Sequence, residues 1–168
     1  PLKLREIIIS LIFTALVRTL IGLVPAIILT SPLFGVSILE LGFPLLLLFL
    51  SLYIFGITLG LFVSAGLIRF GPSFENIAWS SLFLLAPLGC IYYPLEILPN
   101  FFQIIAKALP LVYIFDETRN ILLNNYVDYE NLKQAYLLNI IYFACGTTLF
   151  YLSFLKARIK GTLINMGE

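Results

Sequence analysis

Few side chains in this sequence could carry out covalent chemistry, and they do not form a catalytic set. Histidine is absent from the 168 residues, which excludes a serine–histidine protease and a His-Glu-x-x-His zinc site. Aspartate occurs only at positions 116 and 128, in one segment, which disfavours an intramembrane aspartyl enzyme and an acidic metal cluster. Cys90 and Cys145 fall in apolar runs, where buried free thiols are favoured. We therefore expect no catalytic residue, no bound metal and no cofactor held by this chain.

The composition indicates that lipid is the main solvent of the chain. Apolar residues make up 61% of the sequence and charged residues 11%, whereas a soluble domain carries about 25% charged residues. The mean hydropathy is +1.04. Such a chain could not cover its surface with polar groups. The formal net charge of +1 gives no indication of a nucleic-acid partner, so we expect none.

Charged residues are spaced so that they leave long apolar runs, as membrane-spanning helices require. Crossing the hydrocarbon core takes about 20 apolar residues. Three uncharged runs have 28, 20 and 22 residues and cover 41–68, 76–95 and 134–155. A fourth apolar stretch, near the start, contains a single cation, Arg18. We expect one all-α polytopic transmembrane domain, with four transmembrane helices over residues 8–29, 43–67, 77–93 and 135–155.

The distribution of Lys and Arg predicts the orientation. Four spans place both chain ends on one side, while the loop 31–42 has no cation and acids outnumber bases in 94–134. We therefore expect cytoplasmic termini, including a tail over 156–168, in the cytoplasmic (inner) cell membrane. A start at Pro1, without Met or a signal peptide, suggests a fragment of a longer protein. The cations on the expected cytoplasmic side are Lys3, Arg5, Arg69, Lys156, Arg158 and Lys160.

Residues 94–122 interrupt the apolar pattern with three prolines, Pro94, Pro99 and Pro110. The stretches after Pro99 and after Pro110 each have one apolar and one polar helical face, and neither is long enough to span a bilayer. We interpret them as two re-entrant half-helices that enter the outer leaflet and return. Irregular backbone at that depth must be buried in protein or line a wet cavity, so we expect a packed or hydrated site on the outer side.

Two stretches of this segment, YYPLEILP at 92–99 and ALPLVYIFDETRN at 108–120, resemble the signature of the ABC-2 type permeases. These are the membrane subunits of bacterial and archaeal ATP-driven exporters. The opening PLKLREIII resembles the family's cytoplasmic segment between its second and third spans, so the chain would correspond to spans three to six of six. Leu109 departs from the Asn commonly seen there. The matching positions are Gly89, Tyr92, Tyr93, Pro94, Leu95, Leu98, Pro99, Pro110, Leu111, Tyr113, Asp116 and Arg119.

The resemblance implies partners, because the sequence has no Gly-x-x-x-x-Gly-Lys-[Ser/Thr] loop to bind ATP itself. It implies two copies of a separate ABC-type ATP-binding subunit, which would hold ATP–Mg, and a second permease subunit. Coupling to that subunit would involve the segment 1–6, with Lys3, Arg5 and Glu6, and the loop at Arg69. Positive-inside anchoring is the alternative role for these charges. The expected outer gate consists of Pro94, Glu96, Pro99, Pro110, Tyr113, Asp116 and Arg119.

Arg18 is the one cation placed inside an expected span. A charge at mid-membrane costs at least about 2.5–3.5 kcal/mol on insertion scales. The side chain could extend to the inner interface, or it could line the pathway and meet an anionic headgroup.

Two further patterns concern packing. Asp116 and Arg119 are spaced for an i, i+3 ion pair, for which a structural role is favoured over substrate contact. Gly56, Gly60 and Ser64 form a row of small residues that lets helices approach closely, and packing within the subunit is favoured over a dimer contact.

Two other functions remain open from the sequence. An ATP-independent transporter or channel with half-helices is compatible with Arg18, Pro25 and Pro87, although no inverted repeat is visible. A structural membrane subunit without its own pathway is also compatible. For an exporter, the cargo could be a drug-like amphiphile, a lipid or a polysaccharide carrier.

Overall fold

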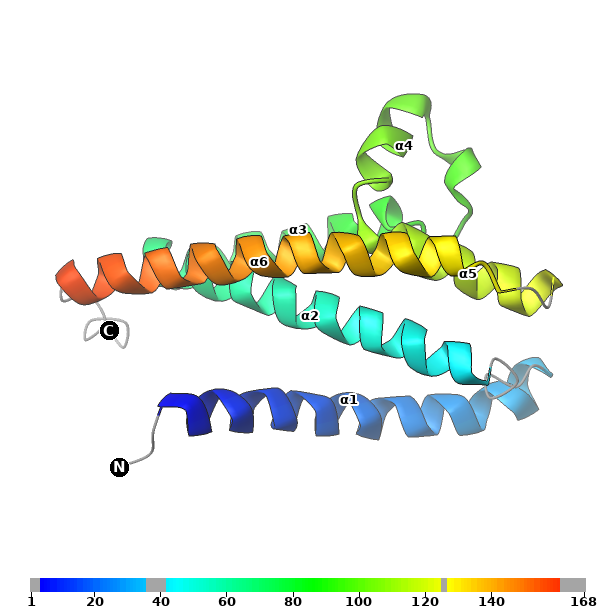
Figure 1. The fold of residues 1–168 in the computed structure, drawn as a ribbon, viewed down its shortest axis with the longest axis horizontal. Coiled ribbons are helices and arrows are strands. Elements are labelled where there is room, and N and C mark those ends of the chain that lie inside the picture. Colours follow the sequence, from blue (N-terminus) through cyan, green and yellow to red (C-terminus); the bar gives the residue numbers. More distant parts are fainter. Residues whose placement is uncertain (1–3, 36–41, 125–126, 161–168) are drawn as a thin grey trace. The chain divides into compact units, whose positions relative to one another are not determined.

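The computed structural model describes residues 4–35, 42–124 and 127–160, and all regular elements in these residues are helical, as expected. Contacts divide the chain into two compact units, residues 1–47 and 48–168. The elements in chain order are α1 (Leu4–Phe34), α2 (Phe43–Phe70), α3 (Phe74–Leu88), the 3₁₀-helix η2 (Leu95–Ile97), α4 (Asn100–Ala106), α5 (Pro110–Asn124) and α6 (Tyr129–Lys160) (Figure 1).

Three helices in the described residues are long and apolar enough to cross a membrane, which indicates a membrane protein. They are Ile12–Thr30 within α1, all of α2, and Tyr129–Ile159 within α6. The helix expected over 77–93 instead runs from Phe74 to Leu88 and has 15 residues, which is about 22 Å at 1.5 Å per residue. It ends early because Cys90 has a positive φ of 54°, which a right-handed helix cannot contain.

The first helix is longer than the expected span over 8–29 and includes residues 4–6 of the expected coupling segment. Lys3 lies outside the described residues. Pro25 and Pro32 are both inside α1, although proline removes one backbone hydrogen bond at its position. The hydroxyl of Thr30 donates to the Ala26 carbonyl at 2.6 Å, the i−4 bond that Thr side chains make within helices.

The unit 48–168 has a seam in which α2 packs against α6. Asn139 of α6 donates from Nδ2 to the carbonyl and the hydroxyl oxygen of Ser51 at 3.0 and 2.8 Å. Seven residues further along both helices, Gly146 lies against Thr58. Residue numbers therefore increase in the same direction along the seam in both helices, so α2 and α6 run parallel. The buried residues of α2 are Leu48, Ser51, Phe55, Thr58, Ala65 and Gly66.

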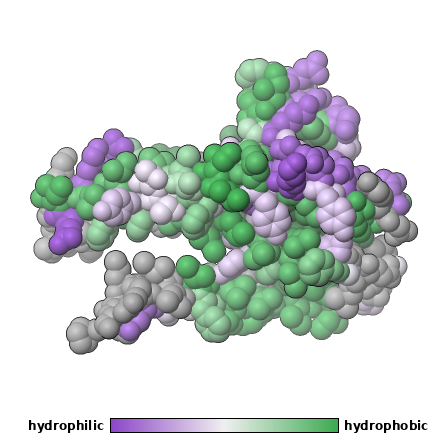
Figure 2. Space-filling view, viewed as in Figure 1, coloured by the Kyte–Doolittle hydropathy of each residue, from purple (hydrophilic) through white to green (hydrophobic). Residues whose placement is uncertain are grey.

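Helix α5 runs antiparallel to α6 and packs along its first half (Figure 1). Tyr142 of α6 donates to the Ala108 carbonyl just before α5, and Asn131 near the start of α6 reaches Glu117. Elements η2 and α4 stand out to the side of this pair. Figure 2 shows hydrophobic side chains along the middle of α6 and hydrophilic ones near its two ends. The tail expected from residue 156 continues α6 to Lys160, and 161–168 lie outside the described residues.

Candidate functional site

The segment from Gly89 to Arg119 forms one packed site, in which three prolines begin three elements. Pro94 and Pro99 precede η2 and α4, and Pro110 is the first residue of α5. Proline suits these positions because its fixed φ fits the first turn of a helix and its missing N–H needs no partner there. Pro110 is fully buried, while Pro94 and Pro99 are exposed. The prolines therefore set the turns of this segment.

Arg119 on α5 binds the irregular backbone that follows α3. Its Nη2 atom donates to the carbonyl of Cys90, to that of Ile91 at 3.3 Å and to that of Tyr93 at 2.9 Å. These carbonyls lie after the helix has ended, so they have no helical N–H partner. Its Nη1 atom is buried and has no hydrogen-bond partner among the described residues. A guanidinium group here satisfies backbone acceptors that would otherwise be costly to bury.

Hydrogen bonds from side chains to carbonyls hold the rest of the segment. The Tyr93 hydroxyl donates to the Pro87 carbonyl at 2.8 Å, and Gln103 donates to the Leu98 carbonyl at 2.7 Å. The Tyr113 hydroxyl donates to the Lys107 carbonyl at 3.0 Å. A small core of Cys90, Ala106 and Val112 lies beneath, packed by Tyr93, Leu95, Leu98 and Leu109.

The expected ion pair between Asp116 and Arg119 is not among the salt bridges of the described residues, because Arg119 turns to the carbonyls instead. Burial raises the pKa of the Asp116 carboxyl, the Glu96 carboxylate raises it further, and Arg119 opposes the rise. Glu96 is exposed. Asp116 thus interacts electrostatically with both Glu96 and Arg119, while the hydrogen bonds of the guanidinium go to the carbonyls.

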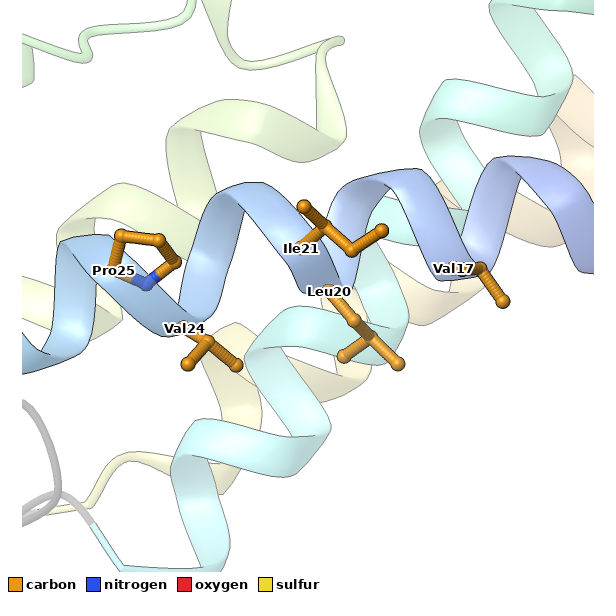
Figure 3. A pocket seen from close by; sticks show the side chains of 5 residues that line it. All are labelled: Val17, Leu20, Ile21, Val24 and Pro25. Carbon is orange, nitrogen blue, oxygen red and sulfur yellow. The ribbon is translucent and has the colours of Figure 1, made fainter.

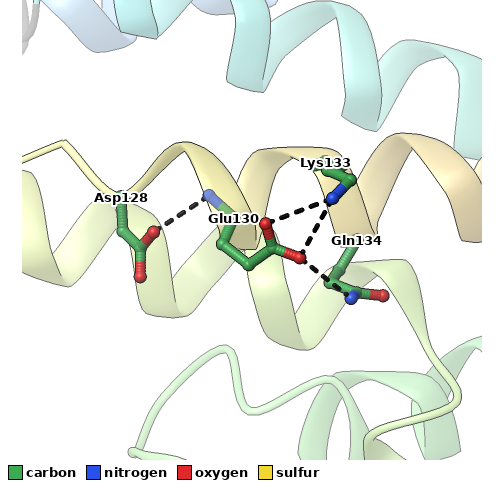
Figure 4. A network of polar contacts seen from close by, with 4 residues as sticks. All are labelled: Asp128, Glu130, Lys133 and Gln134. Carbon is green, nitrogen blue, oxygen red and sulfur yellow. Dashed lines mark hydrogen bonds and ion pairs between the residues drawn. The ribbon is translucent and has the colours of Figure 1, made fainter.

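Glu117 is a site residue that the sequence reasoning missed. It is fully buried, and its carboxylate accepts from the Asp128 backbone N–H at 2.7 Å and from Asn131 Nδ2 at 3.3 Å. The Asp128 side chain accepts in turn from the Glu130 N–H at 2.9 Å, as an N-cap residue does. Figure 4 shows this start of α6, where Glu130 also pairs with Lys133 at 3.4 Å. One signal was present in the sequence: Glu117 continues the buried face of α5 that contains Ile114 and Ile121.

The row of small residues at Gly56, Gly60 and Ser64 does not form the seam of α2 with α6. A Cβ atom added at Gly56 or Gly60 would meet no atom of the described residues within 4 Å, and both glycines are exposed. The small residue that permits close approach is Gly146 of α6, whose added Cβ would lie 3.5 Å from the side chain of Phe62. The sequence row and the packed seam are therefore different faces of α2.

Asn139 is the second residue that the sequence reasoning missed. The residue is 1% exposed, and its Oδ1 atom has no hydrogen-bond partner within residues 4–35, 42–124 and 127–160. Hydrogen bonds between transmembrane helices contribute about 0.6 kcal/mol on average, so this contact mainly fixes which residues of α2 and α6 face each other.

The residues expected to couple the chain to an ATPase are at helix ends or outside the described part. Arg5 lies in the first turn of α1, and Glu6 is exposed. Arg69 is exposed in the last turn of α2, with its guanidinium 5.5 Å from the Phe70 ring centre. These positions leave Glu6 and Arg69 accessible.

Arg18 is exposed on α1, within the candidate span. The same helix has a shallow apolar groove (Figure 3), and none of the side chains that line this groove is charged. The residues that line it are Val17, Leu20, Ile21, Val24 and Pro25.

In the part of the chain that the structure describes, no three His, Cys, Asp or Glu side chains are grouped so that they could hold a metal ion. No protein-family model, no curated protein and no solved structure matches the chain. What can be said of function therefore comes from the geometry and from the residues themselves.

Proposed function

We propose that the chain is the permease part of an ATP-driven exporter, crosses the membrane four times, and uses residues 94–122 as an outer gate. The observation that carries this proposal is the parallel course of α2 and α6. If α2 runs inward, α6 can run inward only when the chain returns to the outer side between Phe70 and Tyr129. An additional crossing is therefore needed between the two helices.

Helix α3 and the residues after it are suited to be that crossing. Its first residue, Phe74, lies against Gly66 near the end of α2. Beyond the last turn of α3, the carbonyls of Cys90 and Tyr93 accept hydrogen bonds from Arg119. Glu117, two residues before Arg119 on α5, contacts the start of α6. The 15 helical residues and the irregular residues that follow thus connect the two ends of the seam. The bonds to Arg119 also make irregular backbone tolerable at membrane depth.

The re-entrant course of residues 94–122 is supported by the bond from Tyr142 to the Ala108 carbonyl. Tyr142 is nine residues further along α6 than Lys133, the last charged residue before the apolar run, or about 13 Å at 1.5 Å per residue. In this proposal the turn between α4 and α5 enters the outer leaflet, the exposed Lys107 beside it extends to the headgroups, and α5 leads back outward. The exposed apolar side chains of η2 and α4, which contact lipid in this arrangement, are Ile97, Phe101, Phe102, Ile104 and Ile105.

In this proposal the architecture serves transport and not catalysis. A proline-broken segment enters from one face, is held by hydrogen bonds to backbone carbonyls, and borders the outer ends of α3 and α6. In this proposal Arg5, Glu6 and Arg69 contact the ATP-binding subunit on the cytoplasmic side, two copies of that subunit bind ATP–Mg, and a second permease subunit completes the pathway. An ATP-independent transporter with the same half-helices is the second candidate, favoured by the exposed Arg18 within a candidate span.

Thiol labelling of the full-length protein in intact cells tests the fourfold crossing. With Cys90 and Cys145 replaced by Ser, Glu75→Cys should react with an impermeant maleimide only after the cells are opened. Glu96→Cys should react from outside, because it follows α3. Glu130→Cys and Lys156→Cys are the matched outer and inner controls. If Glu75→Cys and Glu96→Cys react from the same side, α3 does not cross and the proposal is wrong.

ATP hydrolysis separates the two transport hypotheses. The full-length protein purified from its native membrane should carry vanadate-sensitive ATPase activity, and Arg69→Ala should lower that activity while Lys156→Ala leaves it unchanged. Retained topology without any associated ATPase would favour the ATP-independent transporter.

A further inference from the structure

Cys90 occupies a conformation that residues other than glycine rarely adopt. Its φ is 54°, in the left-handed region, where a Cβ atom crowds the neighbouring carbonyl oxygen. The residue is fully buried and lies between the end of α3 and the start of η2. Strained backbone of this kind persists only where the surroundings hold it, and it is frequent in segments that change conformation.

Arg119 is the group that holds this backbone. Its Nη2 atom bonds the Cys90 carbonyl itself and the carbonyls of Ile91 and Tyr93, across 26 to 29 residues of sequence. The bonds therefore join α5 to the break after α3. Bonds from a charged donor are stronger than neutral ones, so removing Arg119 should free the break more than removing any other single side chain nearby.

Two carboxylates, those of Asp116 and Glu96, are alternative acceptors for the guanidinium. Its Nη1 atom is buried and finds no hydrogen-bond partner in the part of the chain that the structure describes, so these contacts use only part of its donor capacity. Asp116 is one turn away on the same helix, and Asp116 interacts electrostatically with both Glu96 and Arg119. Glu96 lies three residues beyond Tyr93, whose carbonyl accepts from Arg119, so both carboxylates belong to segments that the guanidinium already joins.

We propose that Arg119 is a latch over a hinge at Cys90, with the three carbonyls as its closed seat and the carboxylates of Asp116 and Glu96 as its open seat. In the closed position the break after α3 is fixed and the Cys90 thiol is buried. In the open position the backbone at Cys90 relaxes, and the projection formed by η2 and α4 moves relative to α5. This device does not depend on ATP or on the identity of any transported molecule.

Modification of the Cys90 thiol measures how often the latch opens. The full-length protein in membranes, with Cys145→Ser as the only background change, is treated with N-ethylmaleimide, and the rate of Cys90 modification is followed by mass spectrometry. Arg119→Gln should raise this rate at least tenfold, and Arg119→Lys should give an intermediate rate. Lys107→Gln, which removes an exposed cation from the same segment, should leave the rate unchanged. An unchanged rate in Arg119→Gln overturns the proposal.

Local charge alone would produce the opposite result, since a nearby cation stabilises the reactive thiolate and its loss should slow the reaction. Because Arg119→Gln could also prevent folding, the double variant Asp116→Asn with Glu96→Gln provides a second measurement. It removes the open seat and keeps the closed one, so it should slow modification of Cys90. A purely structural role for Arg119 predicts no such slowing, and an equal or faster rate rejects the open seat.

Discussion

Replacing Glu117 by Gln tests whether a buried carboxylate secures the start of α6. The side chain is fully buried and accepts hydrogen bonds from the Asp128 N–H and from Asn131. Glutamine has nearly the same shape and keeps one oxygen for the Asp128 N–H. It also places an amide NH₂ group opposite the Asn131 amide, which would have to turn its oxygen toward α5. The substitution therefore removes the charge while leaving the packing nearly unchanged.

The expected loss can be worked from these contacts. Hydrogen bonds to charged groups contribute about 1.5–3 kcal/mol and neutral ones about 0.5–1.5 kcal/mol, so the charged share of the bond to the Asp128 N–H is about 1 kcal/mol. An anion near a helix N-terminus adds about 0.3–1 kcal/mol. Glu117→Gln should therefore lower the free energy of unfolding by about 1–2 kcal/mol. Glu117→Ala should cost more, because it leaves the N–H unpaired and a cavity behind.

The measurement is reversible unfolding of the purified protein in mixed micelles, followed by helical circular dichroism as denaturing detergent is added. Glu130→Gln is the matched control, because it makes the same change at the same end of α6. Its pairing with Lys133 is solvent-exposed, with side-chain exposures of 61% and 69%, and such pairs contribute at most about 1 kcal/mol. If Glu117→Gln destabilises the protein no more than Glu130→Gln, the carboxylate does not secure α6 and our account of the site is wrong.

Three further predictions use the same unfolding assay. Gly146→Leu should destabilise the protein by about 1–3 kcal/mol, because the larger side chain overpacks the seam. Gly60→Leu should not destabilise it, because no atom of the described residues lies within 4 Å of a Cβ added at Gly60. Equal effects of the two substitutions would contradict the assigned seam. Burial and Glu96 raise the pKa of Asp116, so the contribution of Asp116 to stability is present at low pH and is lost as pH rises through the raised pKa. Asp116→Asn should therefore reduce the fall in stability with rising pH, and an unaltered pH profile would contradict this prediction. Tyr142→Phe should cost about 1 kcal/mol, the contribution of its bond to the Ala108 carbonyl, and no loss would place the α4–α5 turn elsewhere.

The sequence predicted the helical class and the approximate positions of the long helices. The uncharged runs and the mean hydropathy of +1.04 are local properties, and local hydrophobicity decides whether a segment is stable as a helix in lipid. Prolines and glycines were equally informative. Pro94, Pro99 and Pro110 stand at the starts of η2, α4 and α5, because the fixed φ of proline acts on its own residue and its immediate neighbours.

Charged and small residues were harder to assign from sequence. Asp116 and Glu117 are adjacent and both acidic, and the spacing to Arg119 favoured Asp116 as the important one. The structure buries Glu117 instead, because successive residues of a helix differ in direction by about 100° and only packing against α6 decides which of them faces inward. For the same reason, the seam of α2 contains Ser51 and not Gly56.

By itself, then, the sequence determined the apolar composition, the long apolar helices and the turns at the three prolines, since each depends on residues close together in the chain. Tertiary structure alone decided the partners: Arg119 on carbonyls 26 to 29 residues away, and Asn139 on Ser51 across 88 residues. Most buried donors find an acceptor, but the chain offers many acceptors, and only the packing of helices distant in sequence selects among them.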